Sequence, residues 1–244
     1  MAHHKSSGSK DTIKTIIIAV LIALGIRTVA YEPFNIPSGS MIPTLLIGDY
    51  LFVSKFSYGY SRYSLPFGLP LIPGRIFFDE PERGDIMVFK LPSDNRTDYI
   101  KRIIGLPGDT VQLKDSILYI NGKPVKREKA DDFIDRDEFG NYNRVPRYLE
   151  TLPNGRKHYI LEVTQDTVFD NTPVYTVPQG HYFAMGDNRD RSKDSRFLND
   201  VGFIPRENLV GRAEFLFFSV NGSAWEFWKW SKTLRFSRFF QGLE

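Results

Sequence analysis

An apolar run near the N-terminus is the feature that most constrains how this chain folds. Residues 15–26 (TIIIAVLIALGI) are uncharged and almost all apolar, and they lie between Lys14 and Arg27. As a helix with ~1.5 Å rise per residue this run covers roughly 18 Å, less than the ~30 Å hydrocarbon core of a bilayer. Residues 12–31 cover about 30 Å, with the two cations near the ends, where long side chains reach the headgroups.

Three interpretations of this segment remain open on the residues alone. A cleaved secretory signal has an apolar region of this length, and Thr28-Val29-Ala30 resembles a small-x-small cleavage site. A buried core helix or a retained membrane anchor would also account for it. Because three lysines precede the run and Arg27 directly follows it, an anchor would place the N-terminus in the cytoplasm and residues 32–244 outside.

Composition limits the chemistry that the rest of the chain performs. The 244 residues suffice for one good-sized domain or a core with a subdomain, and 41% hydrophobic with 25% charged residues is ordinary for a folded protein. A net charge of +3 gives no support for a nucleic-acid partner. The sequence has no cysteine, which excludes a disulfide scaffold, a thiol nucleophile and a cysteine zinc site. It also lacks HExxH, Walker A and GxGxxG motifs, so metalloprotease and nucleotide chemistry are unsupported.

Residues 32–49 (EPFNIPSGSMIPTLLIGD) combine prolines, a pair of serines and an apolar end. The first two prolines keep the backbone extended, and Gly39 lets it pass close to another chain because it has no Cβ. A rigid, apolar-flanked segment of this kind suits a nucleophilic serine, which must be held still beside oxyanion donors. Ser38 or Ser40 could equally cap a short turn, since Ser-Gly-Ser is common in loops.

Short runs of β-favouring residues recur through the rest of the chain, separated by turn signals. Asn121-Gly122 and Asn154-Gly155 are dipeptides typical of hairpin turns. Residues 57–82 are rich in Pro, Gly and aromatic residues without periodicity, which favours a long apolar hairpin or loop. We predict a mainly β fold, with an antiparallel β core, a smaller β insertion subdomain and one N-terminal helix. The expected strands lie within 48–56, 86–91, 98–104, 111–113, 117–120, 148–151, 158–163, 180–185 and 210–218.

One of these strands, residues 98–104 (DYIKRII), carries a candidate general base. Because side chains alternate between the faces of a strand, Lys101 lies between Tyr99 and Ile103, and Arg102 lies between two isoleucines. Each face thus places one cation between apolar residues, and we expect one of the two cations to point inward. Burial would lower the pKa of a lysine from ~10.4, because it disfavours the charged form.

The sequence offers few other bases for a serine nucleophile. His158 and His181 are the histidines outside the N-terminal region, and both lie outside any motif, so we expect a satisfied structural role for each. A Ser-Lys dyad is a known variant of the Ser-His-Asp triad. Lys101 is therefore the best-placed base in the chain.

Residues 186–196 (GDNRDRSKDSR) form a long polar stretch. A solvated surface loop is one interpretation, and the alternating charges also suit an ordered loop that is paired internally. Its three aspartates, Asp187, Asp190 and Asp194, lack the glycine and the distal glutamate of an EF-hand loop. We therefore expect no calcium site there.

Two further segments are candidates for contact with lipid. Residues 65–72 are apolar and lie in the expected loop, where they would dip into the bilayer surface. Residues 225–244 (WEFWKWSKTLRFSRFFQGLE) mix Trp, Phe and basic residues, a composition that suits a bilayer interface. Packing against the rest of the fold is the alternative for both.

Four segments in order resemble bacterial type I signal peptidases, the membrane-bound serine proteases that remove signal peptides. They are residues 32–49, GDYLFVSKF (48–56), RGDIMVFKLP to DYIKRIIGLPGD (83–109) and MGDNRDRSKDSRF to GFIPRENLVGRA (185–213). The resemblance implies that the β core is catalytic and needs no metal or cofactor. It favours a retained, single-pass anchor in the bacterial inner (cytoplasmic) membrane, with the catalytic domain on the periplasmic or extracytoplasmic side.

With this resemblance, the chain divides into six expected parts. The N-terminal parts are a cytoplasmic tail (1–11) and the membrane helix (12–31). The catalytic β core has a first part (32–114) and a second part (181–224), separated by the insertion subdomain (115–180). An aromatic-basic tail (225–244) ends the chain.

The resemblance also implies a role for each residue of the site. Ser40 matches the nucleophile and Lys101 the general base. The Ser40 backbone N–H and the Ser38 hydroxyl match the oxyanion hole, and Ser192 matches the hydroxyl that orients the lysine amine. Two ion pairs, Asp187 with Arg102 and Asp194 with Arg196, would hold the polar loop against the base.

The implied substrate is an extended signal peptide ending in Ala-x-Ala, which would pair as an added strand along residues 34–38. Shallow pockets would admit small side chains and exclude large ones. The expected lining residues are Phe34, Ile36, Pro37, Met41, Leu45, Tyr99 and Ile100. The expected partners are the signal peptides of exported preproteins and the lipid bilayer, with no nucleic acid, and the protein is expected to be a monomer. Alternatives are a self-cleaving Ser-Lys peptidase and a non-catalytic, membrane-anchored β-scaffold.

Overall fold

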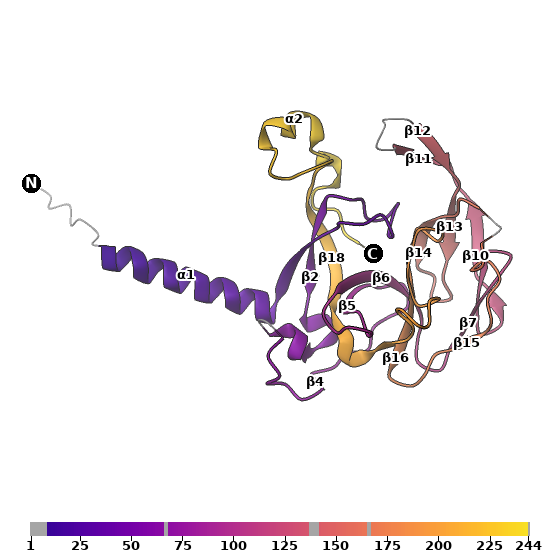
Figure 1. The fold of residues 1–244 in the computed structure, drawn as a ribbon, viewed down its shortest axis with the longest axis horizontal. Coiled ribbons are helices and arrows are strands. Elements are labelled where there is room, and N and C mark those ends of the chain that lie inside the picture. The colour runs from indigo at the N-terminus through magenta and orange to yellow at the C-terminus, as the bar shows by residue number, and fades with distance from the viewer. Residues whose placement is uncertain (1–8, 66–67, 137–141, 165–166, 244) are drawn as a thin grey trace, which may run out of the picture.

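A computed structural model describes residues 9–65, 68–136, 142–164 and 167–243. Its one long helix, α1 (Ser9–Val29), extends away from a body built mainly of strands (Figure 1). The mainly β, antiparallel fold with a single N-terminal apolar helix is as predicted.

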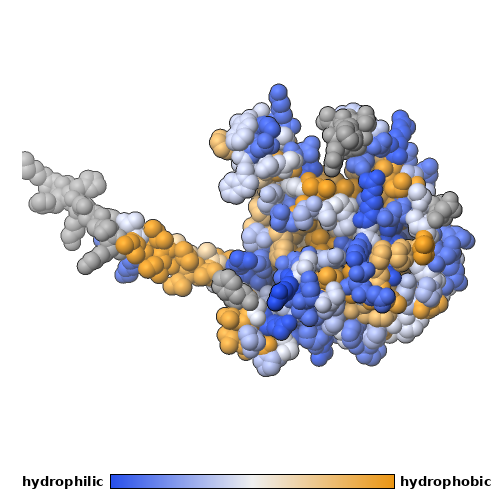
Figure 2. Space-filling view, in the orientation of Figure 1, coloured by the Kyte–Doolittle hydropathy of each residue, from blue (hydrophilic) through white to orange (hydrophobic). Residues whose placement is uncertain are grey.

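Helix α1 is exposed over almost all of residues 11–29. Residues 11–29 have a mean hydropathy of 2.0, and none of this stretch is buried against the body, so apolar side chains cover the surface of the helix (Figure 2). This exposure contradicts the interpretation as a buried core helix. The helix begins before residue 12, where we expected it to begin, and it ends at Val29 because the chain turns into strand β1 at Tyr31, two residues before Pro33.

A seven-stranded sheet forms the centre of the body. Its strand order is β1-β2-β18-β5-β6-β16-β17, and every neighbouring pair is antiparallel. Strand β1 is at one end, so its outer edge pairs with no strand among the described residues. The strand bounds are β1 (Tyr31–Asn35), β2 (Asp49–Ser54), β5 (Ile86–Lys90), β6 (Asp98–Gly105), β16 (His181–Met185), β17 (Ile204–Pro205) and β18 (Leu209–Ser219).

Between β6 and β16 the chain forms smaller antiparallel sheets, on the right of Figure 1. The Asn121-Gly122 hairpin joins β8 to β9 with positive φ at both residues, and the Asn154-Gly155 turn joins β13 to β14, as expected. The strands are β7 (Thr110–Lys114), β8 (Ile117–Ile120), β9 (Lys123–Pro124), β10 (Lys126–Lys129), β11 (Phe133–Arg136), β12 (Tyr142–Val145), β13 (Arg147–Thr151), β14 (Lys157–Leu161) and β15 (Tyr175–Thr176).

The apolar stretch expected at 57–82 is a loop with a short hairpin. Strands β3 (Tyr60–Ser61) and β4 (Arg75–Ile76) pair across it, and residues 66–67 lie outside the described residues. The Arg75 guanidinium donates to the carbonyls of Tyr58 and Gly59 within the loop, at 3.0 and 2.9 Å, and its Nε donates to the Arg206 carbonyl at 3.0 Å, which attaches the loop to the body. The expected bilayer contact of 65–72 stays a prediction.

Both faces of β6 are covered by core residues. Ile103 packs with Met87 and Ala184 on one face, while Ile104 packs with residues of the smaller sheets on the other. Lys101 and Arg102, on opposite faces, are only 4% and 2% exposed. One of these cations was expected to point inward, and both are buried, because elements from distant parts of the chain close over both faces.

The C-terminal tail divides into a packed part and an exposed part. Arg235 and Arg238 both reach the buried Asp49 carboxylate, and Leu243 joins the core cluster behind the serine segment. Trp225 and Trp228 remain 87% and 65% exposed, before the short helix α2 (Trp230–Thr233). Packing accounts for the end of the tail, and contact with lipid stays a prediction for the exposed aromatic residues.

Candidate active site

The serine pair lies on the turn that connects β1 to β2. Ser40 is buried, with 8% of its surface exposed, whereas Ser38 is exposed. Asn188 holds the turn from the polar loop: its backbone N–H donates to the Ser40 carbonyl at 3.1 Å, and its side-chain amide donates to the Gly39 carbonyl at 3.0 Å. The backbone on both sides of the Ser40 hydroxyl is therefore tied to a distant segment.

Lys101 approaches this turn from β6. Its Nζ donates to the Ser40 Oγ at 2.8 Å and to the Ile100 carbonyl at 2.9 Å. The ammonium also lies 5.2 Å from the centre of the Tyr99 ring. The amine is thus within hydrogen-bond reach of the candidate nucleophile, as general-base chemistry requires.

The surroundings of Lys101 change its acidity. Burial lowers the pKa of its ammonium from 10.5 to about 8, although the Asp194 and Asp187 carboxylates raise that pKa. Burial has this effect because the charged form loses hydration. A substantial fraction of the amine is therefore neutral near pH 8 and able to accept a proton.

The Ser38 hydroxyl lies beside the nucleophile candidate. Its Oγ is 3.5 Å from the Ser40 Oγ. A donor at this place, together with the Ser40 backbone N–H, is near the position where an oxyanion would form on a carbonyl attacked by Ser40.

A bidentate ion pair links β6 to the polar loop. Arg102 donates to the two carboxylate oxygens of Asp187 at 2.9 and 2.8 Å, and to the Gly84 carbonyl at 2.7 Å. Burial alone would raise the pKa of Asp187, but the Arg102 guanidinium and further donors more than offset it, so that pKa lies below its usual value. The pair stays charged and joins β6 to the loop directly behind Lys101.

A second ion pair closes the loop on itself. Arg196 donates to both carboxylate oxygens of Asp194, at 2.8 and 2.9 Å, and to the Arg189 carbonyl at 2.6 Å. Asp194 also accepts from the Gly186 N–H at 3.0 Å. Both expected pairs are present, and the polar loop is an ordered, internally paired structure rather than a solvated one.

Comparison with known proteins identifies the family. The family described as signal peptidase, peptidase S26, matches residues 9–218 of the chain. The chain belongs to this family. The signal peptidase I of Rickettsia typhi is 42% identical over 253 residues, covering 96% of this chain and 94% of that protein, and the signal peptidase I of Rickettsia canadensis is 43% identical, covering 98% and 96%. A crystal structure of a signal peptidase I from Enterococcus faecalis is 31% identical and covers 55% of this chain and 97% of that one, with a TM-score of 0.32.

Within this S26 peptidase, the Ser192 hydroxyl is buried beside the Asp194 carboxylate, whose pKa it helps to lower. Among the described residues it makes no well-aligned hydrogen bond to the Lys101 amine, so its role in orienting that amine stays a prediction. It packs against Gly186, where a Cβ would lie 2.2 Å from the Ser192 Oγ and 2.4 Å from the Ser40 carbonyl oxygen. Gly186 thus lets the polar loop approach the nucleophile turn closely.

A cleft of about 510 Å³ opens at the serine–lysine pair of the S26 peptidase. It runs between β1 and the start of β6, and Ser38 and Ser40 lie in it with Lys101. Five of the seven residues expected to bind substrate line the cleft, namely Phe34, Ile36, Pro37, Tyr99 and Ile100.

The other two expected substrate-binding residues, Met41 and Leu45, do not line this cleft. Both are fully buried in the core cluster that also contains Ile36, Leu51 and Val53. The apolar end of the serine segment therefore anchors the turn from behind. Arg191 and Lys193 of the polar loop line the cleft instead, and sequence reasoning missed them because nothing in a charged run shows which members face a cleft.

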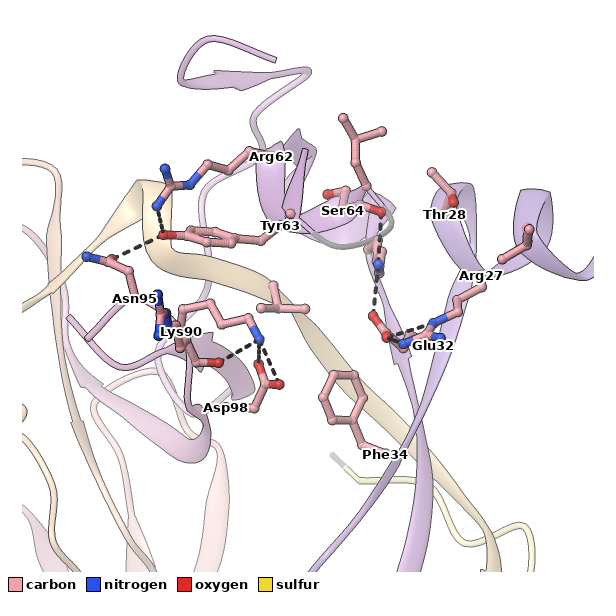
Figure 3. Close-up of a pocket in the computed structure, with 16 residues that line it drawn as sticks. Arg27, Thr28, Glu32, Phe34, Arg62, Tyr63, Ser64, Lys90, Asn95 and Asp98 are labelled. Atoms are coloured by element: carbon pink, nitrogen blue, oxygen red, sulfur yellow. Dashed lines mark hydrogen bonds and ion pairs between the residues drawn. The ribbon is translucent and has the colours of Figure 1, made fainter. Parts of the chain in front are cut away.

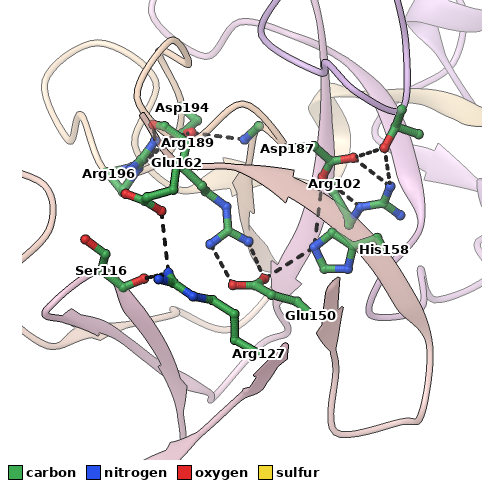
Figure 4. Close-up of polar contacts among 12 residues, drawn as sticks. Arg102, Ser116, Arg127, Glu150, His158, Glu162, Asp187, Arg189, Asp194 and Arg196 are labelled. Atoms are coloured by element: carbon green, nitrogen blue, oxygen red, sulfur yellow. Dashed lines mark hydrogen bonds and ion pairs between the residues drawn. The ribbon is translucent and has the colours of Figure 1, made fainter. Parts of the chain in front are cut away.

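The histidines take no part in the serine–lysine pair. His181 lies 2.9 Å from the Gln179 carbonyl through its Nδ1. His158 is buried, and its Nε2 lies 3.4 Å from the Glu150 carboxylate and 4.0 Å from that of Asp187 (Figure 4). Burial lowers the pKa of His158, although the contact with Glu150 raises it. Its place beside these two buried carboxylates fits the expected structural role, while its Nδ1 has no hydrogen-bond partner among the described residues.

The carboxylates that cluster in the structure are not the three aspartates of the polar loop that the sequence brought up as possible calcium ligands. Asp187 and Asp194 are occupied by arginines, whereas Asp190 lies with Glu162 and Asp170, their ligand oxygens within 4.8 Å of one another. Burial raises the pKa of Glu162 to about 8, and calcium takes six to eight oxygen ligands. These three carboxylates alone do not make such a site.

Asn188 and Thr44 are the supporting residues that sequence reasoning missed. Asn188 clamps the nucleophile turn, and the Thr44 hydroxyl donates to the Asp187 carboxylate. Asn188 lies next to Asp187 in the polar loop, within a segment that matches the family, and this position could have marked it as a site residue. Thr44 also lies in a matched segment, residues 32–49, but nothing in the sequence pointed to its partner, which is 143 positions away.

Proposed function

We propose that this chain is a membrane-anchored serine endopeptidase that removes N-terminal signal peptides from exported preproteins. Ser40 is the nucleophile and Lys101 is the general base. The observation that carries the proposal is the 2.8 Å contact between the Lys101 amine and the Ser40 hydroxyl, in surroundings that lower the pKa of the amine to about 8. A base with a pKa near the working pH is the effective kind.

The reaction passes through an acyl-enzyme. The neutral Lys101 amine accepts the Ser40 proton while the Ser40 oxygen attacks the scissile carbonyl carbon. The resulting oxyanion accepts hydrogen bonds from the Ser40 N–H and the Ser38 hydroxyl, each lowering the barrier by about 3 kcal/mol. The protonated lysine then gives its proton to the leaving amine, which frees the mature protein. In the second half, Lys101 takes a proton from water, whose oxygen attacks the ester carbonyl; the ester C–O bond then breaks, Lys101 returns the proton to the Ser40 oxygen, and the signal peptide leaves as its carboxylate.

The substrate lies extended in the cleft beside β1. The outer edge of β1 has no partner strand among the described residues, so its backbone groups are available to pair with a peptide. Ile36 and Ile100, with Pro37, form shallow apolar walls next to Ser40 that suit small side chains such as those of an Ala-x-Ala site.

Helix α1 is the anchor. Its 21 residues cover about 31 Å, enough to cross a bilayer, and its exposed apolar surface needs a hydrophobic environment. The lysines before the apolar run favour a cytoplasmic N-terminus in the bacterial inner membrane, with the catalytic body on the other side as a monomer.

Cleavage of a purified preprotein in detergent tests the function. Wild type and Ser40→Ala are compared, and the new N-terminus of the product is read by mass spectrometry. We expect one cut after an Ala-x-Ala sequence that disappears in the variant. A cut that persists in Ser40→Ala would assign the chemistry to another residue.

The same assay separates the alternatives. A self-cleaving Ser-Lys peptidase would cut mainly its own chain, whereas the proposed enzyme cuts added preprotein. A non-catalytic scaffold would cut neither, and its Ser40 would resist labelling by a serine-reactive phosphonate.

A further inference from the structure

A second cavity, of about 580 Å³, lies where the membrane helix meets the body (Figure 3). We call it the junction cavity. The last turns of α1 form one wall through Leu24, Arg27 and Thr28, and the loop between β5 and β6 forms another through Asn95 and Arg96. No residue of the serine–lysine pair lines it, although Phe34 and Asp98 belong to both this cavity and the cleft.

The junction cavity carries a surplus of positive charge. Five cations and two carboxylates line the cavity, which leaves three positive charges uncompensated. Glu32 is shared by Arg27 and Lys55, at 2.5 and 2.8 Å, and Asp98 is taken by Lys90 at 2.8 Å. The lining cations are Arg27, Lys55, Arg62, Lys90 and Arg96.

Two arginines of the cavity, both exposed, form no side-chain ion pair among the described residues. Arg62 donates to the Tyr63 hydroxyl at 2.6 Å, and that hydroxyl donates to Asn95 at 3.1 Å. Arg96 makes its hydrogen bonds through its backbone: its N–H donates to Asp94 at 2.8 Å, and its carbonyl accepts from the Lys90 Nζ at 3.0 Å. Its guanidinium attracts the Asp94 carboxylate without forming an ion pair with it. Guanidinium groups left without carboxylates suit a phosphodiester, which they bind through paired N–H donors.

The position of the cavity along α1 places it at the level of lipid headgroups. If α1 spans the bilayer, Arg27 in its last turn lies at the membrane surface, and the cavity beside it opens at the same depth. The exposed apolar flank of α1 directly below, including Leu24, offers a surface for acyl chains. Basic pockets between membrane helices on the cytoplasmic side bind anionic lipid headgroups, and the same pairing of guanidinium with phosphate applies to this cavity on the opposite side.

We infer that the junction cavity binds the phosphodiester headgroup of an anionic phospholipid, with Arg62 and Arg96 as its principal ligands. The inference rests on the proposed membrane insertion of α1 but not on the proposed cleavage reaction. A bound lipid would hold the cleft at a set height above the membrane, because the two cavities share Phe34 and Asp98.

Lipid retention by the full chain tests this site. The protein carries Ser40→Ala, so that the measurement does not depend on catalysis. It is extracted from bilayers with equal amounts of phosphatidylglycerol and phosphatidylcholine of the same acyl chains, and retained lipid is counted by native mass spectrometry. We expect preferential retention of phosphatidylglycerol, lowered on the order of tenfold by Arg62→Gln with Arg96→Gln.

The matched control removes the same charge elsewhere. Lys123→Gln with Lys129→Gln changes two exposed cations on β9 and β10, which do not line the cavity. We expect retention to match that of the parent. An equal loss in both double variants would mean attraction by overall charge, and unchanged retention in the arginine variant would also overturn the site.

Two further outcomes would assign the cavity to another ligand. Displacement of the lipid by millimolar inorganic phosphate would mean that free phosphate is the ligand. The arginine double variant is also made in the enzyme that keeps Ser40, and its KM for preprotein is compared with that of wild type in uncharged detergent. A higher KM in this variant, with lipid retention intact, would mean that the substrate peptide occupies the cavity. Either result would overturn the lipid assignment. Circular dichroism of each variant distinguishes such results from misfolding.

Discussion

At the scale of single residues, Lys101 is the side chain whose surroundings matter most. Its amine is buried and makes two hydrogen bonds, one of them to Ser40. The proposed mechanism needs the neutral amine, and the burial that favours this form also makes the charged form costly. Activity and stability therefore make opposite demands on this position.

Replacement of Lys101 by methionine should separate these two demands. We expect cleavage to fall by at least about 100-fold, since general bases contribute 10²–10⁴-fold. The pKa of Lys101 is about 8 in the folded state and 10.5 in the unfolded state, so the charged lysine destabilises the folded protein. This destabilisation is fully present below pH 8 and disappears above pH 10.5. Replacing the charged lysine by methionine should therefore raise the free energy of unfolding at pH 7 by as much as about 3 kcal/mol, measured by urea denaturation. An active Lys101→Met enzyme would refute the base assignment.

The pH profile of cleavage should report the same group. Because the base acts only when neutral, kcat/KM should rise about tenfold per pH unit up to pH 8 and level off above it. An exposed lysine would place this transition near pH 10.4. Initial rates on a peptide substrate from pH 5 to pH 10 measure the profile. A profile that is flat between pH 6 and pH 8 would contradict a base with this pKa.

At the scale of elements, the polar loop and β6 depend on a buried ion pair. Asp187→Ala should destabilise the protein by about 3–5 kcal/mol, because it leaves the Arg102 guanidinium buried without its carboxylate. Urea denaturation of the protein in detergent gives the value. The loop should also detach from β6, so cleavage should fall with stability.

A second ion pair in the same region provides the control. Lys193 and Asp200 are about half exposed, and their ion pair is 2.9 Å long. Asp200→Ala should change stability by less than about 1 kcal/mol, since exposed pairs contribute little. Equal effects of the two substitutions would show that burial does not decide the contribution of the Asp187 pair.

At the scale of the whole molecule, α1 meets the body at its C-terminal end. Its polar links to the body include the Arg27–Glu32 pair, in which Arg27 is itself exposed, and the hydrogen bond that the Tyr60 hydroxyl donates to the Val29 carbonyl at 2.8 Å. Deletion of residues 1–29 should leave a folded body that cleaves short peptides at nearly the full rate. On sedimentation with membranes, the truncated protein should be found in the supernatant rather than in the membrane pellet. Persistent pelleting would show that another surface, such as that around Trp225 and Trp228, binds lipid strongly.

The sequence by itself determined the local features of this protein. The apolar run predicted α1, the Asn-Gly dipeptides predicted their turns, and short β-favouring runs predicted most strands of the central sheet, although not β1 or the strands β10, β11 and β12. Four matched segments named Ser40 and Lys101 before any geometry was known. These features were predictable because each depends on neighbouring residues, or on motifs that keep their order along the chain.

Only the tertiary structure decided which side chains are buried and which meet. It buried both Lys101 and Arg102, moved Met41 and Leu45 out of the expected cleft, and joined Asn188 to the serine turn. It also gathered the junction cavity from α1, β1 and the loop before β6. The physical reason is that burial, and with it the pKa of Lys101, depends on what distant elements place over each face of a strand, whereas sequence pattern reports only the alternation of faces.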